Sequence, residues 1–485
     1  MFLGKNGLGK NQRFFLFLFF FLFQAFSAYP YSLKGRLDAI VHEPVLRGAK
    51  IGVYVQLLGT HKTLFSYHAN EPFIPASNLK ILTTSAALVT LGPDYRFVTR
   101  VLGGKIKNGA LEGNLILKGG GDPTWNSHFF PSPLDPLKHI AKELRKKGIK
   151  EVDGDLVVDD SLFSHQFTGI GWKYRYRWAS YAEEISALSL NNNRIRVTVL
   201  PESYGGAPIR VVFWPPCHVI HVSNHAWTSD NGTSISISRH KIGNRLIVYG
   251  HIYRYSNGIA FPFNVQDPPL FVGSAFKSVL RKYGIRVIGR VREIRPEEIE
   301  TENRLGVLAT FYSPRLIVIV RHLLKWSVNF LAEHIFRMIG AADYGKGSIQ
   351  SGEEAVVKFL NDYGILHHGL VMDDGSGLSG FDRVSPRTLV EVMQKMASLP
   401  VGPIFRNALN TGNEGTLEGR LAGVNVRAKD GAIRHVSSLT GYVVTTYGQT
   451  LVFSIIFNHF DMSEYNADGY VDQIVRTLAK VDYPL

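Results

Sequence analysis

The stretch PASNLKILTTSAALVTLG, residues 75–92, decides how the rest of the chain is interpreted. Its apolar residues recur at helical spacing from Asn78 to Leu91, and a Gly-Pro pair ends the pattern, so a helix is predicted here. Ser77 then lies at the N-terminus of that helix, where backbone N–H groups are free, and Lys80 lies one turn later on the same face. A buried lysine of lowered pKa can take the proton of such a serine. The two residues are therefore candidates for the nucleophile and the base of an acyl transfer.

The Ser-x-x-Lys pattern is weak support when it stands alone. The chain contains it twice more: Ser238 to Lys241 ends a strand-like run, and Ser274 to Lys277 lies inside an ordinary amphipathic helix. Without further motifs, Ser77 is better explained as the N-cap of its helix than as a nucleophile.

A second motif of such sites, Ser-x-Asn, supplies a hydroxyl that relays protons and an amide that binds substrate. Three candidates exist. Ser229 begins a literal Ser-Asp-Asn, but a glycine and an alternating strand follow, which is typical of a turn. Ser189 leads into a strand, whereas Ser327 opens a helix directly after another helical segment, HLLKW at 322–326. We expect the motif at a corner between two helices, so Ser327 and Asn329 are selected.

Composition limits the class of protein. The 485 residues include 54 lysines and arginines against 40 aspartates and glutamates, a formal net charge of +14. That excess suits an anionic wall or membrane surface, or is only a solvated basic face. No nucleic-acid motif accompanies it, so nucleic acid is not an expected partner. Cys217 is the only cysteine, which excludes an intramolecular disulfide, and the histidines show no metal-ligand spacing. Neither a metal nor another cofactor is expected.

The N-terminus has the pattern of an export signal. Basic residues precede the apolar run FFLFLFFFLF at 14–23, and Ala25 and Ser27 follow at the spacing of a signal-peptidase site. The run is shorter than the ~20 residues that cross a bilayer. Residues 1–27 are therefore predicted to be a cleaved signal peptide, with an uncleaved anchor as the alternative. The mature protein is expected in the periplasm, where its basic surface allows peripheral membrane association.

The remaining chain changes character twice. Short strands separated by Gly, Asn and Asp turns fill 97–265, and long amphipathic helices return from 266, followed by three strands and a last helix. This pattern predicts an α+β fold in which one domain, formed by 28–96 and 266–485, carries β-rich inserted domains at 97–265.

A third motif lies in VNVRAKDGAIRHVSSLTGYVV, residues 424–444, which contains Lys429, Asp430 and Gly431. An Asp-Gly pair between two β-rich runs predicts a hairpin turn. The same residues also fit an altered Lys-Thr-Gly, a motif of serine enzymes that act on D-alanyl peptides and β-lactams. The two interpretations are compatible, because a lysine that ends a strand at a sheet edge can face a substrate carboxylate.

With these motifs in order, the sequence resembles the low-molecular-mass class C penicillin-binding proteins, a D-alanyl-D-alanine carboxypeptidase/endopeptidase family. The similarity extends over nearly the whole mature chain, and the spacing from Ser77 to Ser327 fits the large insertion of that family. Besides the three motifs, the resemblance is carried by residues 75–97, LKGGGDPTW (117–125), GDLVVDDSLF (154–163), ISALSLNNN (185–193), MDDGSGLS (372–379), GNEGTLEGRL (412–421) and TGYVVT (440–445).

The resemblance implies a penicillin-binding/β-lactamase-like domain, an antiparallel sheet with helices, into which two nested β-rich domains are inserted. It also implies a reaction in which Ser77, deprotonated by Lys80, attacks the carbonyl between two D-alanines or that of a D-alanyl–diaminopimelate crosslink. The substrates would be peptidoglycan peptides, with β-lactams as covalent inhibitors. Water would hydrolyse the acyl-enzyme, and backbone N–H groups, including that of Ser77, would bind the oxyanion.

Further roles follow from the resemblance alone. Ser327 would relay a proton to the leaving amine, and Asn329 would hold Lys80 and the substrate. Lys429 would place positive charge near the substrate carboxylate. Asp159 stands where the family binds the amino end of diaminopimelate, although an aspartate in a turn is a comparable explanation.

Two residues depart from the family pattern. Asp430 replaces a threonine whose hydroxyl helps to bind the terminal carboxylate, and Gly380 stands where an arginine often follows DGSGLS. An acid at 430 repels an anionic substrate unless it is paired, and Arg427 and Arg434 are the expected partners. Both changes affect carboxylate recognition, and neither affects Ser77 or Lys80.

The sequence thus favours an exported serine D-alanyl-D-alanine carboxypeptidase or endopeptidase. The alternatives are a catalytically weak peptidoglycan-binding scaffold of the same fold and a β-lactamase-like hydrolase, which the insertion and the family motifs disfavour.

Overall fold

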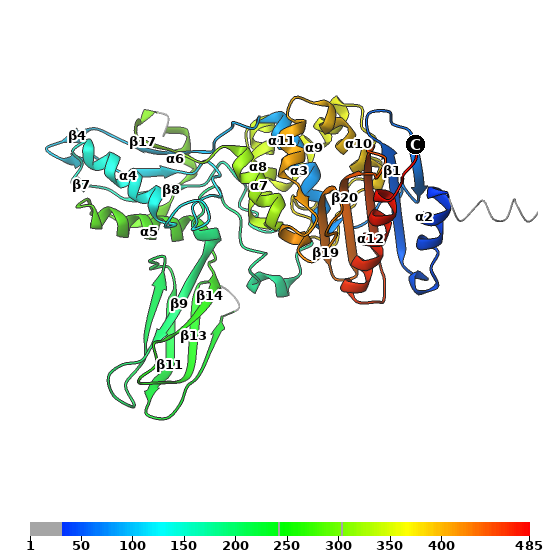
Figure 1. The fold of residues 1–485 in the computed structure, drawn as a ribbon. Helices are drawn as coiled ribbons and strands as arrows, with labels where there is room; N and C mark the ends of the chain where they lie inside the picture. The colour runs from blue at the N-terminus through cyan, green and yellow to red at the C-terminus, as the bar shows by residue number, and fades with distance from the viewer. Residues whose placement is uncertain (1–31, 241–242, 302–303) are drawn as a thin grey trace, which may run out of the picture.

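The computed structural model describes residues 32–240, 243–301 and 304–485 (Figure 1). The predicted signal peptide, 1–27, lies outside these residues. Within them, no helix combines the length and the apolar character needed to span a bilayer.

One antiparallel sheet joins the two ends of the chain. Its six strands lie in the order β18-β19-β20-β21-β1-β2, and the whole of β1 pairs with β21. Residues near the N-terminus therefore complete a sheet that the C-terminal residues build. The strands are β1 (Lys50–Leu57), β2 (Thr63–Tyr67), β18 (Asn410–Thr411), β19 (Val426–Ile433), β20 (Val436–Val444) and β21 (Thr450–Asn458).

Helices cover both faces of this sheet, which explains why its central strands, β20 and β21, are almost wholly buried. Successive side chains of a strand point to opposite faces. Accordingly, Leu451 and Phe453 of β21 pack with the helices of one face, α2 (Leu33–Val41) and α12 (Glu464–Ala479), whereas Val452 packs with the helical cluster on the other.

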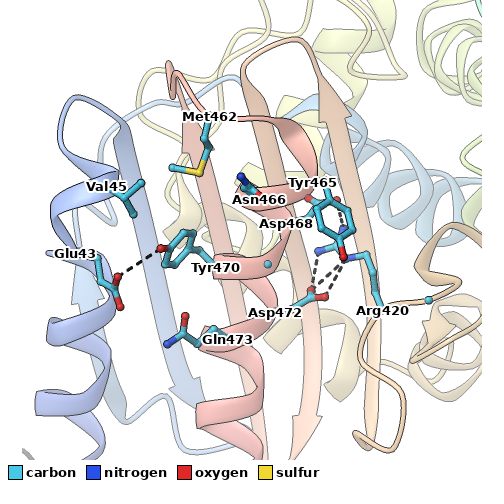
Figure 2. Close-up of a pocket in the computed structure, with 12 residues that line it drawn as sticks. Glu43, Val45, Arg420, Met462, Tyr465, Asn466, Asp468, Tyr470, Asp472 and Gln473 are labelled. Atoms are coloured by element: carbon cyan, nitrogen blue, oxygen red, sulfur yellow. Dashed lines mark hydrogen bonds and ion pairs between the residues drawn. The ribbon is translucent and has the colours of Figure 1, made fainter.

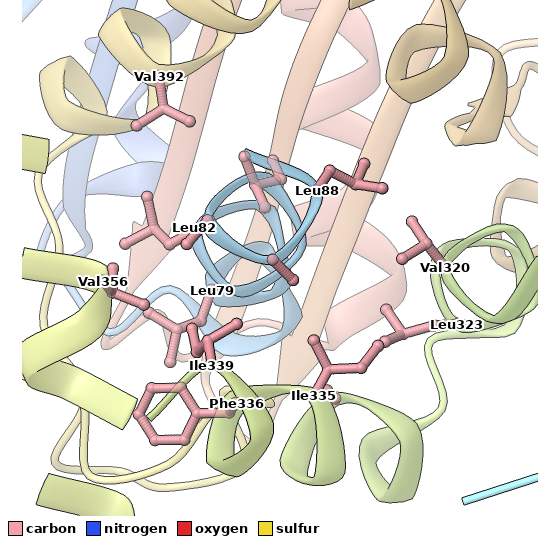
Figure 3. Packing of buried hydrophobic residues seen from close by; sticks show 14 of the residues in the cluster. Leu79, Leu82, Leu88, Val320, Leu323, Ile335, Phe336, Ile339, Val356 and Val392 are labelled. Atoms are coloured by element: carbon pink, nitrogen blue, oxygen red, sulfur yellow. The ribbon is translucent and has the colours of Figure 1, made fainter. Parts of the chain in front are cut away.

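Helix α3 runs through the middle of that helical cluster (Figure 3). The helices are α3 (Lys80–Thr90), α7 (Leu316–Trp326), α8 (Asn329–Tyr344), α9 (Ile349–Asp362), α10 (Pro386–Ser398) and α11 (Gly402–Ala408). Every α3 residue from Lys80 to Leu88 is buried, as in helices enclosed on all sides. The surrounding side chains in Figure 3 are Val320, Leu323, Ile335, Phe336, Ile339, Val356 and Val392. The lysine at the start of α3 is thereby removed from water.

The segment after α3 leaves this body and forms two further lobes (Figure 1). The first holds two sheets, β16-β8-β6-β3-β17 and β15-β7-β5-β4, with three helices. Its elements are β3 (Val98–Gly103), β4 (Ile106–Lys107), β5 (Ala110–Leu111), β6 (Leu115–Lys118), α4 (Asp135–Lys146), β7 (Glu151–Val152), β8 (Leu156–Asp159), α5 (Pro268–Lys282), β15 (Arg286–Val287), β16 (Val291–Glu293), α6 (Pro296–Thr301) and β17 (Gly306–Tyr312).

The second lobe is nested within the first. It consists of two three-stranded sheets, β10-β9-β14 and β11-β13-β12. The strands are β9 (Arg194–Leu200), β10 (Arg210–Trp214), β11 (His221–Ser229), β12 (Ser234–Arg239), β13 (Arg245–Tyr253) and β14 (Ile259–Asn264).

The inserted segment ends later than the sequence indicated. Residues from 266 onward were expected to rejoin the first domain, but β16 pairs with β8 and β17 pairs with β3. The chain therefore returns to the helical cluster only at α7. Helix α5 explains the difference: its apolar face packs on β8 and β16 of the first lobe, and an amphipathic pattern predicts a buried face without saying what covers it.

Candidate active site

Ser77 lies in a tight 3₁₀ turn, Ala76–Leu79, that leads into α3. Two glycines from distant parts of the chain press against its backbone. A Cβ atom built on Gly377 would lie 1.8 Å from Ala76 O, and one built on Gly431 would lie 2.7 Å from Ser77 N. Ser438 of β20 adds a hydrogen bond from its Oγ to Pro75 O at 2.7 Å. The turn is thus held between the 374–379 loop and the edge of the sheet.

The Lys80 ammonium lies between Ser77 and three other parts of the fold. Its Nζ donates to Ser77 Oγ at 2.8 Å, to Asn329 Oδ1 at 2.7 Å and to the Ser376 carbonyl at 2.6 Å. The side chain is fully buried. The structure therefore brings together Ser77, Lys80 and Asn329, which the sequence had selected from two separate motifs.

Burial makes Lys80 a far better base than an ordinary lysine. Removal from water, and next the positive charge of Lys429, lower the pKa of Lys80 to about 7. The negative charges of Asp374, Glu333 and Asp430 act in the opposite direction and keep the pKa from falling further. A substantial fraction of the amine is therefore neutral near pH 7 and able to accept a proton.

Ser327 and Asn329 lie at the corner between α7 and α8, as predicted. Ser327 follows the last turn of α7 in a left-handed conformation, with φ at +57°. Asn329 begins α8, and its Nδ2 donates to the carbonyl of Tyr181 at 2.9 Å, which ties the corner to the inserted segment. The Asn329 amide thus accepts a hydrogen bond from Lys80 through its oxygen and donates one to the backbone beside the site through its nitrogen.

A cleft of about 600 Å³ opens beside Ser77. Both Ser327 and Asn329 line it, so the nucleophile and the Ser-x-Asn motif share one cavity. The other lining residues are Arg175, Tyr176, Tyr181, Gly377, Leu378, Ala432, Ile433 and Arg434. The rejected motif serines Ser189, Ser229, Ser238 and Ser274 do not line it.

Lys429, Asp430 and Gly431 lie inside a strand, which corrects the expectation of a strand end and a hairpin turn. In β19 these residues pair with Thr440, Leu439 and Ser438 of β20. The chain turns later, where His435 has a φ of +61°. Gly431 is needed because β19 approaches Ser77 closely, and not because the chain turns there. This requirement comes from tertiary packing, so rules based on local turn sequences cannot predict it.

The sequence profile of the D-Ala-D-Ala carboxypeptidase 3 (S13) family matches residues 33–481. The chain belongs to this family. The predicted resemblance and the predicted enzyme class, a serine D-Ala-D-Ala carboxypeptidase, are thereby confirmed.

Individual relatives agree with the S13 assignment. The D-alanyl-D-alanine carboxypeptidase of Actinomadura sp. (strain R39) is 30% identical over 449 residues, which cover 88% of this chain and 81% of that protein. The D-alanyl-D-alanine carboxypeptidase DacB of Haemophilus influenzae is 27% identical over 433 residues, 86% and 87% of the two chains. The crystal structure of penicillin binding protein 4 (dacB) from Haemophilus influenzae matches with a TM-score of 0.77 at 25% identity, covering 92% and 99%. The predicted fold class is confirmed.

Asp430 of this S13 enzyme is paired, but not with the expected arginines. Its Oδ1 accepts hydrogen bonds from Lys429 Nζ at 2.7 Å and from Thr416 Oγ1. Arg427 instead donates to the Leu409 carbonyl, and Arg434 donates to His435. The reason is geometric: Arg427 is an odd number of residues from Asp430 and so points to the other face of the strand, and Arg434 lies beyond the strand end.

A network on the far side of β19 keeps Asp430 ionised. Burial raises the pKa of Asp430, but the charge and hydrogen bond of Lys429, the Thr416 hydrogen bond and the charge of Arg420 together hold the pKa below its ordinary value. Arg420 is fixed in turn by Asp468 at 2.8 Å and Asp472 at 2.7 Å, both from α12 (Figure 2). These residues line a separate cavity of about 590 Å³, which shares no lining residue with the cleft at Ser77.

Two acids near Lys80 were not singled out from the sequence. Asp374 accepts hydrogen bonds from the N–H groups of Ser376 at 2.9 Å and Gly377 at 2.5 Å, which fixes the loop whose Ser376 carbonyl meets Lys80. Glu333 is fully buried, and burial followed by the charge of Asp374 raises its pKa to about 8. The sequence did contain features that point to these two acids: Asp374 lies within MDDGSGLS, and Glu333 follows Asn329 by one helical turn.

Asp159 lies apart from this S13 cleft. It ends β8 in the first inserted lobe, where its Oδ1 accepts from the Ser161 N–H at 2.9 Å and its Oδ2 lies 3.6 Å from Lys118 Nζ. It is absent from the residues that line the cleft. These local contacts are those of an aspartate that orders the end of a strand.

Proposed function

We propose that this carboxypeptidase forms an acyl-enzyme on Ser77 and acts on peptidoglycan peptides in the periplasm. The observation that carries the proposal is the buried Lys80 amine, 2.8 Å from Ser77 Oγ and held by Asn329 on its other side. Family membership supports the D-Ala-D-Ala bond as the target. Cleavage of D-alanyl crosslinks, reaction with β-lactams, export through residues 1–27 and peripheral association with an anionic surface belong to the same proposal.

Acylation begins from neutral Lys80. Two of its N–H groups stay on Asn329 Oδ1 and the Ser376 carbonyl, while its lone pair takes the Ser77 proton across their contact. The freed Ser77 oxygen attacks the carbonyl carbon between the two D-alanines. The N–H groups at the start of the Ser77 turn lack partners within the turn and stabilise the oxyanion.

The second half of the reaction returns the proton. As the C–N bond breaks, the proton on Lys80 passes to the leaving amine, with the Ser327 hydroxyl in the cleft as its relay. Water then attacks the ester as Lys80 takes its proton, and that proton passes from Lys80 to Ser77 Oγ as the ester bond breaks. No metal or other cofactor has a part in these steps.

Release of D-alanine from a peptide that ends in D-Ala-D-Ala tests this function. The wild type should release it, and Ser77→Ala should not. A scaffold that binds peptidoglycan without cleaving it would show binding and no release by either protein. Digestion of crosslinked muropeptides then measures endopeptidase activity separately, because cleavage of a crosslink yields no free D-alanine.

The rate of acylation should depend on pH through Lys80. Because only the neutral amine accepts the Ser77 proton, the rate should rise about tenfold per pH unit below about pH 7 and level off above it. The positive charge of Lys429 is the second cause of the lowered pKa of Lys80. Lys429→Met should therefore raise the pKa of Lys80 and shift the rising part of the pH–rate profile to higher pH. Acylation rates of the wild type and of Lys429→Met, measured across the pH range, give the two profiles. A rising part at the same pH in both proteins would contradict the proposed electrostatics.

Replacing Asp430 by threonine should increase carboxypeptidase activity. The change removes the carboxylate that neutralises Lys429 and frees its ammonium for a substrate carboxylate, a charge-assisted contact that contributes on the order of tenfold or more. Initial rates of D-alanine release measure the change. Asp94→Thr, which removes an exposed ion pair with Arg315, is the matched control. Equal rates in wild type and Asp430→Thr would show that the Asp430 carboxylate does not oppose substrate binding.

A further inference from the structure

Lys429 is not available to a substrate in the cleft. Its side chain is fully buried, and its Nζ lies 2.7 Å from both the carbonyl and the Oδ1 of Asp430. It is not among the residues that line the cleft beside Ser77. Its charge is thus already neutralised by a neighbour that packing and hydrogen bonds hold in place, and an entering carboxylate would have to compete with that pair.

The charged side chains that do line the cleft are both arginines. Arg434 follows the end of β19, and Arg175 belongs to a 3₁₀ turn of the inserted segment, Tyr174–Trp178. No aspartate or glutamate lines the cleft, and neither arginine forms an ion pair within the described part of the chain. A cavity walled by two unneutralised cations and no acid attracts an anionic group.

Arg434 is oriented so that its outer edge stays free. Its Nε donates to His435 Nε2 at 3.0 Å. His435 Nδ1 lies 2.9 Å from the Phe460 carbonyl, so Nδ1 carries the proton and Nε2 is the acceptor. Neither terminal amino group of Arg434 donates to another described residue. The guanidinium is therefore held at one nitrogen, with both terminal amino groups left for a bidentate contact with a carboxylate.

Arg175, on the inserted segment, is also positioned by the side chain of the residue that follows it. Its guanidinium lies over the ring of Tyr176, 5.5 Å from the ring centroid, and Tyr176 itself lines the cleft. The neighbouring Tyr181 accepts the hydrogen bond of Asn329, which anchors this segment to the site. The segment thus brings a second cation to the cavity that contains Ser77.

We propose that Arg434, assisted by Arg175, binds the carboxylate of the peptide substrate in place of the buried Lys429. The inference rests on the proposed function, since it assigns the charge recognition of the same site. Arg434 is a specificity-determining residue here, and His435 is a positioning residue that acts through it.

The test compares two peptides that differ only in the terminal group, a free D-Ala-D-Ala carboxylate and its neutral carboxamide. Arg434→Ala should lower kcat/KM for the carboxylate peptide by about 10- to 100-fold, mainly through KM, and leave the carboxamide nearly unchanged. Arg434→Lys should restore part of the loss, and Arg175→Ala should show a smaller loss of the same kind. Arg427→Ala, on the same strand but not among the residues that line the cleft, is the control and should resemble the wild type.

A second background sharpens the test. If Asp430→Thr releases Lys429, the loss caused by Arg434→Ala should be smaller in that background than in the wild type, because two cations then share the task. An equal loss for both peptides in Arg434→Ala, or no loss for either, would overturn the inference while leaving Ser77 chemistry intact. A wild type that neither releases D-alanine nor reacts with penicillin would overturn the proposed function, and the inference with it.

Discussion

Lys80→Met should lower the rate at which penicillin acylates Ser77 by about 10²- to 10⁴-fold, the range that general-base catalysis contributes. Methionine has nearly the length of the lysine side chain but cannot accept the Ser77 proton. The change also leaves Asn329 Oδ1 and the Ser376 carbonyl without their donor, which loosens the site further. The time course of labelling by a fluorescent penicillin gives the rate.

The matched control is Lys358→Met, an exposed lysine of α9 that pairs with Asp343. Its acylation rate should equal that of the wild type, since surface ion pairs contribute little. Thermal unfolding of both variants shows whether each is folded. A folded Lys80→Met that reacts at the wild-type rate would mean that another group takes the proton of Ser77.

Gly431→Ala should reduce acylation by about 100-fold or more, the cost of misplacing a reacting atom by roughly 1 Å. A Cβ atom on Gly431 would lie 2.5 Å from Ser438 Oγ, 2.7 Å from Ser77 N and 2.8 Å from Pro75 O. Two of these are backbone atoms, so the strain cannot be relieved by turning a side chain and must move the Ser77 turn away from β19. The acylation rate should fall while most of the fold persists.

Gly380→Ala provides the comparison, because nothing lies within 4 Å of a Cβ atom built there. It should be acylated like the wild type. The decisive pair of measurements is the acylation rate and the melting temperature of each variant. Normal acylation of Gly431→Ala would show that the contact between β19 and the Ser77 turn does not set the position of the nucleophile.

The parts of the site that depend on local sequence could be predicted. Ser77 and Lys80 share a face because helical geometry places residues three apart together, and the Ser327 corner follows from two helical patterns that meet. The structure places Ser77 and Asn329 in contact with the buried Lys80 amine, and Ser327 in the cleft beside them. The Ser-x-x-Lys pattern alone did not select Ser77, because it also occurs at Ser274. Ser274 was rejected on its context: it lies inside α5, a helix with an ordinary amphipathic pattern.

The parts that depend on tertiary contacts could not be predicted. Asp430-Gly431 reads locally as a turn, yet the close approach of β19 to Ser77 makes the glycine necessary within a strand. The hydrogen-bond partners of Asp430 are Lys429 and Thr416. They depend on which face of β19 Asp430 points to and on the loop that contains Thr416, and the separation of residues along the sequence reveals neither. Likewise, the helical pattern at 268–282 does not say that α5 packs on the inserted sheet.

The most direct test of the account is to locate the covalent adduct. The wild-type protein is treated with penicillin and digested, and the peptides are analysed by mass spectrometry. The account predicts one penicilloyl group, on Ser77, and none after Ser77→Ala in a protein that still folds. An adduct on another residue, or a folded wild type that carries none, would contradict it.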